Sequence, residues 1–130
     1  MKNNTIIKIL LTSFIAVNLF HLLIIVKVVP YNIAWGGRLQ NDLEMYVFET
    51  VSILINLFLV LVLLMKGEYI KFRFNNKVIN IILWVFVALF LLNTVGNILA
   101  KTIFEKFFAI LTLSFAILIW KILKTNNNGK

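Results

Sequence analysis

The chain has 130 residues, of which 62% are hydrophobic, and its 13 basic residues outnumber its 5 acidic residues to give a formal net charge of +8. A mean hydropathy of +0.98, concentrated in long apolar stretches, excludes a soluble domain and indicates an integral membrane protein, whose spans normally have basic flanks; nucleic-acid binding is not expected. The absence of cysteine excludes disulfides, thiolate nucleophiles and zinc–cysteine sites.

Four stretches are mostly apolar over the length of about 20 residues that a transmembrane helix needs. Because the connections between them are short, consecutive helices should be antiparallel. The sequence therefore predicts an all-α membrane protein, a four-transmembrane-helix up-down-up-down bundle that forms one domain over residues 1–124. The expected spans are residues 6–29, 43–65, 77–97 and 102–123.

The first span follows Thr5, a candidate N-cap, and is expected to stop at Pro30. It carries Asn18 and His21 on one helix face, and His21 is the only histidine in the chain. The stretch is too long for the apolar core of a signal peptide, and no small-residue cleavage pattern precedes Pro30. We therefore predict that this segment is retained as a membrane span.

Residues 30–39, PYNIAWGGRL, connect the first and second spans. Their two glycines permit a tight turn, and Trp35 suits the headgroup interface. Alternatively, the turn folds over the bundle as a lid and directs Arg38 into the interior, where its guanidinium can pair with an acid or an anionic headgroup. The sequence does not choose among three acidic partners for this arginine, Asp42, Glu44 and Glu49.

The second span is predicted to begin with a capping box of Asn41 and Glu44 and to end at Gly67. It carries Glu49 and, two turns along the same face, Asn56. An ionisable residue inside a span is a functional-site hypothesis by default. A neutral amide could join two helices without the cost of desolvating a carboxylate, which favours a functional role for Glu49.

The third span is predicted to be capped by Asn75 or Asn76. Near its other end Asn93 and Asn97 share a face, because they are four residues apart. Gly96, between them, allows close approach of another helix.

The fourth span opens with the Thr-x-x-Glu pattern of Thr102 and Glu105, which is typical of a capping box. Its phenylalanine and leucine stripes are expected to pack or to face lipid. The tail at residues 125–130 is rich in asparagine and is predicted to be disordered.

The distribution of lysine and arginine predicts the orientation. Nine of these residues flank the two termini and the central loop, and four lie at the other two loops. By the positive-inside rule, the N and C termini are then cytoplasmic, and the loops near residues 30–42 and 98–101 are outside. We expect a cell membrane location, and a composition rich in Ile, Asn, Lys and Phe favours a bacterial source.

Three spans thus place polar side chains in their outer halves, where lipid cannot satisfy them. At about 1.5 Å per residue, His21 and Glu49 lie at similar depths, roughly 12 and 9 Å from the outer helix ends. We predict that these side chains face one another in an outward-facing polar pocket, and the alternative is a hydrogen-bond network that only fixes helix register. The candidate catalytic residues are Glu49 and His21, and the candidate ligand-binding residues are Glu49, His21, Arg38, Asn93, Asn97, Asn18 and Trp35.

The sequence contains no metalloprotease, serine-hydrolase or phosphate-loop motif. A single histidine without cysteine argues against a metal site, so we expect neither a metal ion nor another cofactor. Two segments, WGGRLQNDLEMYVFE at residues 35–49 and NTVGNILAKTIFEKF at residues 93–107, resemble those of small bacterial four-span membrane proteins. The resemblance covers most of the chain and implies the fold, but it carries no activity.

Three functions remain open. The first is a non-enzymatic membrane protein whose pocket binds a small molecule, a lipid headgroup or a partner protein. The second is a proton-coupled transporter or membrane-embedded enzyme that uses Glu49 and His21, with Arg38 on the substrate. The third is an immunity or accessory protein. The shortness of the chain favours the first, and transport would require a homo-oligomer or a membrane partner.

Overall fold

The computed structural model describes residues 3–31, 39–100 and 102–128, and within these residues it contains four long α-helices and no strand. They are α1 (Asn3–Ile25), α2 (Asp42–Lys66), α3 (Asn76–Ile98) and α4 (Ile103–Asn128). Each is long and apolar enough to cross a membrane. The predicted all-α fold of four antiparallel spans is confirmed, and the chain is a multi-pass membrane protein.

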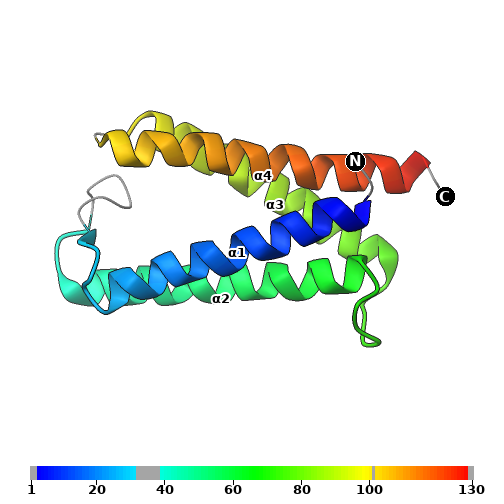
Figure 1. Ribbon diagram of the computed structural model, residues 1–130, viewed down its shortest axis with the longest axis horizontal. Helices are drawn as coiled ribbons and strands as arrows, with labels where there is room; N and C mark the ends of the chain where they lie inside the picture. The colour runs from blue at the N-terminus through cyan, green and yellow to red at the C-terminus, as the bar shows by residue number, and fades with distance from the viewer. Residues whose placement is uncertain (1–2, 32–38, 101, 129–130) are drawn as a thin grey trace.

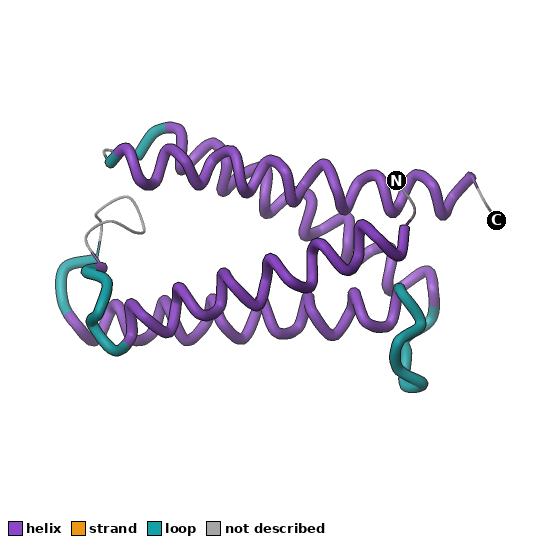
Figure 2. Tube along the Cα trace, in the orientation of Figure 1, coloured by secondary structure: helices purple, strands orange, loops and turns teal. Residues whose placement is uncertain are grey.

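The bundle is built from two helical hairpins (Figures 1 and 2). α3 packs most closely on α4 and α1 packs mainly on α2, while thinner contacts join α1 to α4 and α2 to α3. Figure 1 shows both termini at one end of the bundle. We call this end, which also holds the α2–α3 connection, the terminal end, and we call the opposite end the distal end.

Phenylalanine side chains join the two hairpins. Phe14 of α1 is fully buried, and its ring centroid lies 5.8 Å from that of Phe90 on α3 and 4.6 Å from that of Phe115 on α4. Phe20 of α1 lies within 5.6 Å of two further phenylalanine rings on α4, closer to the distal end. This packing fixes which faces of α1, α3 and α4 turn inward.

The starts of α2, α3 and α4 follow their sequence signals, whereas α1 begins at Asn3, two residues before its predicted cap, Thr5. Asn41 caps α2 by accepting the backbone N–H of Glu44 at 2.9 Å. Thr102 Oγ1 accepts the N–H of Glu105 at 3.1 Å. Of the two candidate N-caps of α3, Asn75 is the one that caps the helix: its side chain accepts the backbone N–H of Lys77 at 2.8 Å.

α1 ends at Ile25, short of its predicted end at Val29. Lys27 has a φ of 65°, and two backbone hydrogen bonds of 3.0 Å return from this turn to the last turn of the helix, which is the pattern of a Schellman motif. The chain therefore leaves the helix at a left-handed lysine, and Pro30 is not the stop that the sequence predicts.

The same motif ends α2, where Glu68 has a φ of 61°. Gly67 has a right-handed φ of −83°, so it does not supply the positive φ that glycine usually supplies at a helix end. Instead, the Tyr69 ring packs against it, and a Cβ at Gly67 would lie 2.6 Å from Tyr69 Cε2. Glycine therefore suits this position because the ring of Tyr69 leaves no room for a side chain.

α4 continues beyond the predicted end at Leu123 and reaches Asn128. Residues 125–128, which the sequence assigns to a disordered tail, are thus part of the helix. These residues are polar, so a prediction based on apolar stretches does not include them. They can still be helical, because extending an existing helix does not carry the cost of nucleation.

Candidate functional site

Glu49 of α2 and His21 of α1 contact each other near the distal end of the bundle. The Glu49 side chain is 0% exposed, and its Oε2 hydrogen-bonds His21 Nδ1, whose side chain is 17% exposed. One proton between a carboxyl group and an imidazole satisfies both, because each group can hold it. The two ionisable residues that the sequence places at similar depth therefore form a direct pair.

A second polar contact lies deeper between the same helices. Asn56 Nδ2 donates a hydrogen bond to Asn18 Oδ1 at 3.2 Å, and Asn18 is buried. Asn18 is one turn of α1 from His21, and Asn56 is two turns of α2 from Glu49. We call these four residues, Asn18, His21, Glu49 and Asn56, the α1–α2 polar seam.

An ion pair on the surface lies next to the seam, toward the distal end of the bundle. Lys27 forms an ion pair with Asp42, and each side chain is about half exposed. The hydrogen bond and the charge of Asp42 raise the pKa of Lys27 above its usual range. A pair this exposed contributes little to stability because water screens it.

The three candidate partners of Arg38 have described contacts of their own. Asp42 pairs with Lys27, Glu49 pairs with His21, and Glu44 Oε1 accepts a backbone N–H at the start of α2 at 2.8 Å. Two predicted site residues, Trp35 and Arg38, lie outside the residues that the structure describes, as does most of the predicted lid.

The structure places Asn93 and Asn97 differently from the sequence prediction. Asn93 is exposed and Asn97 is half-buried, and no described hydrogen bond joins either residue to the α1–α2 polar seam. Thr94 is the polar residue that α3 buries, and its Oγ1 lies 2.8 Å from Thr112 Oγ1 on α4. The packing of Phe90 on the rest of the core sets this helix rotation, which turns the adjacent position, and not Asn93, inward.

Thr94 is a buried polar residue that the sequence prediction of inward-facing side chains does not include. It falls four residues after Phe90, in register with the buried apolar positions of α3, which are Ile79, Leu83, Phe86, Val87 and Phe90. A polar residue in phase with a buried stripe is the signal that could have identified it.

Two hollows on the described surface lie away from the seam. One follows α1 at the terminal end, and the other is an apolar groove of about 450 Å³ between α2 and α3. Neither is lined by His21 or Glu49. The described residues therefore show the pair closed by direct contact where the sequence predicts an open pocket, and they bring no three metal-binding side chains together.

Comparisons of the chain with protein-family models, with curated proteins and with solved structures gave no match. The local chemistry of the seam is thus the basis on which a function can be argued.

Proposed function

We propose that this protein is a cell membrane protein, with both termini cytoplasmic, that binds a small molecule, a lipid headgroup or a partner protein around the His21–Glu49 pair. One observation carries the proposal: a fully buried carboxylate hydrogen-bonds a partly exposed imidazole near the distal end of the bundle. A ligand that presents an ammonium or hydroxyl group can replace His21 as the donor to Glu49.

Helix association alone does not require this carboxylate. Asn18 and Asn56 already join α1 to α2 through neutral amides, and hydrogen bonds between membrane helices typically contribute about 0.6 to 2 kcal/mol. An ionisable pair adds a desolvation cost that a second amide pair would avoid. This difference supports a role in binding for Glu49 and His21.

The partial exposure of His21 gives such a ligand a point of entry. Its ring lies at the boundary of the seam, while Glu49 lies behind it. Rotation of the imidazole would open the carboxylate to an incoming donor without separating the two helices, because the Asn18–Asn56 contact would remain.

Binding of an amine headgroup tests the proposal. Protein in phosphatidylcholine nanodiscs should gain thermal stability when phosphatidylethanolamine is added, and Glu49→Gln should lose at least most of that gain. Glu44→Gln is the matched control because it removes an exposed carboxylate from the same end of α2. Soluble ethanolamine and glycerol serve as small-molecule probes in the same assay. If wild type and Glu49→Gln show equal thermal stabilisation by phosphatidylethanolamine and by both probes, the proposal is contradicted.

Proton-coupled transport or catalysis is the second candidate, and the direct contact of two protonatable groups supports it. Imidazole and carboxyl groups can pass a proton along such a hydrogen bond. In proteoliposomes with an imposed pH gradient, this candidate predicts proton flux that Glu49→Gln and His21→Gln abolish. Unchanged flux in both variants would exclude it, and would favour an accessory role that depends on shape alone.

A further inference from the structure

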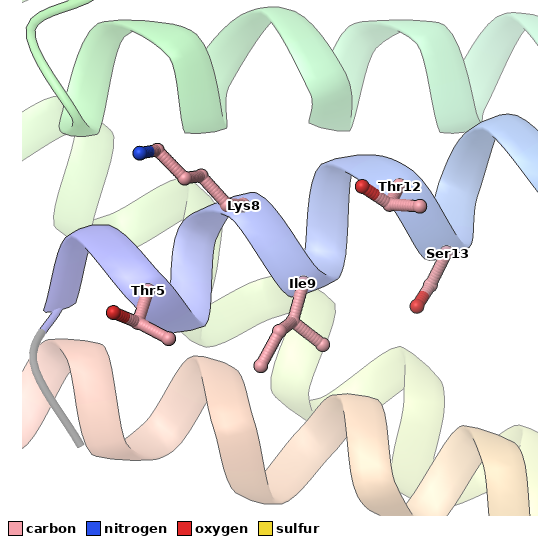
Figure 3. Close-up of a pocket in the computed structure, with 5 residues that line it drawn as sticks. All are labelled: Thr5, Lys8, Ile9, Thr12 and Ser13. Atoms are coloured by element: carbon pink, nitrogen blue, oxygen red, sulfur yellow. The ribbon is translucent and has the colours of Figure 1, made fainter.

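A hollow of about 370 Å³ opens along α1 near the terminal end, and none of its lining residues belongs to the α1–α2 polar seam. Its lining residues are Thr5, Lys8, Ile9, Thr12 and Ser13. Figure 3 shows Lys8 and Thr12 on the side of α1 that faces α2, and Ile9 and Ser13 on the side that faces α4. The hollow therefore occupies the open face of α1 between these two helices.

Lys8 places a positive charge inside a membrane-spanning helix. At about 1.5 Å per residue it lies roughly 8 Å into α1 from Asn3, and it is exposed. Its aliphatic stem can carry the ammonium group toward the headgroup level. Thr12, four residues after Lys8, adds a hydroxyl donor on the same face, and Thr5 and Ser13 add hydroxyl groups on the side that faces α4 (Figure 3). This hollow thus offers one cation and three hydroxyl groups, and no acidic side chain lines it.

The same helix face becomes apolar toward the middle of the bundle. Ile15 and Leu19 continue the stripe of Lys8 and Thr12, and both are exposed, by 60% and 57%. From Lys8 to Leu19 the helix rises about 16 Å, close to half of the roughly 30 Å hydrocarbon core of a bilayer. The face therefore presents charged and hydroxyl donors toward the terminal end and, deeper along the same helix, apolar side chains that an acyl chain can contact.

Charge is distributed unequally between the two ends of the molecule. Four of the five acidic residues, Asp42, Glu44, Glu49 and Glu105, lie at the distal end, which leaves Glu68 as the acid of the terminal end. The described basic residues of the terminal end are Lys8, Lys66, Lys71, Arg73, Lys77, Lys121 and Lys124. This end is electrostatically complementary to an anionic membrane surface.

We infer that the α1 hollow binds one anionic phospholipid, whose phosphate contacts Lys8 with Thr5 or Thr12 and whose acyl chain lies along Ile15 and Leu19. A headgroup phosphate accepts hydrogen bonds from all three donors, and the anionic charge of the lipid offsets that of Lys8. The inference is independent of the His21–Glu49 pair, because neither residue lines the hollow and the phosphate would contact α1 nearer the terminal end.

Native mass spectrometry of the delipidated protein in a mild detergent can test the inference. Phosphatidylglycerol and phosphatidylcholine with identical acyl chains are added in turn. Wild type should prefer phosphatidylglycerol, and Lys8→Gln should weaken its binding about fivefold, the effect of one cation near a membrane surface. Lys8→Arg should keep the preference. Lys71→Gln is the matched control, because it removes an exposed charge from the same end outside the hollow.

Each outcome bears on the inference. The double variant Thr5→Val, Thr12→Val preserves side-chain shape and should lower the affinity for phosphatidylglycerol. Inorganic phosphate should not displace the lipid, because phosphate has no acyl chain. Equal binding of the two lipids, or equal losses in Lys8→Gln and Lys71→Gln, would overturn the inference. So would a lipid-independent dimer that forms a cross-link through the Thr5–Thr12 face, because a second chain would then occupy the hollow.

Discussion

A carboxyl group buried between two membrane helices needs a hydrogen-bond partner, and Glu49 has one in His21. The neighbouring asparagines make a useful comparison because they join the same helices with neutral groups. The energetic difference between the two contacts should therefore reveal how strongly the ionisable pair is coupled.

A double-mutant cycle measures this coupling. We expect His21→Ala and Glu49→Ala each to destabilise the protein, and the double variant to lose less than the sum, with a coupling free energy of about 1 to 2 kcal/mol. The control cycle, Asn18→Ala with Asn56→Ala, should give about 0.6 kcal/mol. Reversible unfolding in mixed detergent micelles provides the measurement. Strict additivity for His21 and Glu49 would mean that the contact does not stabilise the fold.

Among the helices, the left-handed residue that closes α2 permits a test of backbone strain. Glu68 has a φ of 61°, a conformation that costs a residue with a side chain roughly 1 to 2 kcal/mol. Glu68→Gly should therefore raise the free energy of unfolding by about 1 kcal/mol relative to Glu68→Ala, since both variants lose the exposed contact with Arg73. The same unfolding assay applies. Equal stability of the glycine and alanine variants would show that this turn is not maintained in the membrane.

The starts of α2, α3 and α4 were predictable, whereas the end of α1 and the left-handed turn after α2 were not, for a physical reason. A cap such as that of Asn41 is made by a side chain three residues from its partner, so the sequence contains the whole interaction. The turns at Lys27 and Glu68 depend on backbone conformations that neither side chain favours.

The same distinction applies to the candidate site. Counting residues along two apolar spans placed His21 and Glu49 at one depth, and their contact follows from that depth once α1 and α2 pair. The rotation of α3 depends on how Phe90 packs against Phe14 and Phe115. This packing is tertiary, and the phase of Thr94 with the apolar stripe of α3 is the one sequence signal that favours it over Asn93 as the inward-facing residue.

For the whole molecule, the contact between the two hairpins depends heavily on Phe14. Phe14→Ala should destabilise the bundle by about 2 kcal/mol, mainly through the cavity that the substitution leaves. Loss of the ring adds little transfer free energy, because lipid solvates the ring when the helices are apart. Phe107→Ala, at an exposed position of α4, should change stability by only a few tenths of a kcal/mol. Unfolding in micelles can measure the loss of stability, and cross-linking between α1 and α4 can measure the loss of contact between the two hairpins. Equal effects of the two substitutions would contradict this assignment of the core.

The uneven charge of the molecule also predicts its orientation, and the absence of cysteine makes the prediction easy to test. Basic residues at the terminal end should keep that end in the cytoplasm. Single cysteines can replace Gln40 at the distal end and Lys71 at the terminal end, both of which are exposed. In intact cells a membrane-impermeant maleimide should label Gln40→Cys and spare Lys71→Cys, whereas both should react after lysis. Labelling of Lys71→Cys in intact cells would reverse the topology and place the His21–Glu49 pair in the cytoplasmic half of the membrane, where its ligand would have to come from inside the cell.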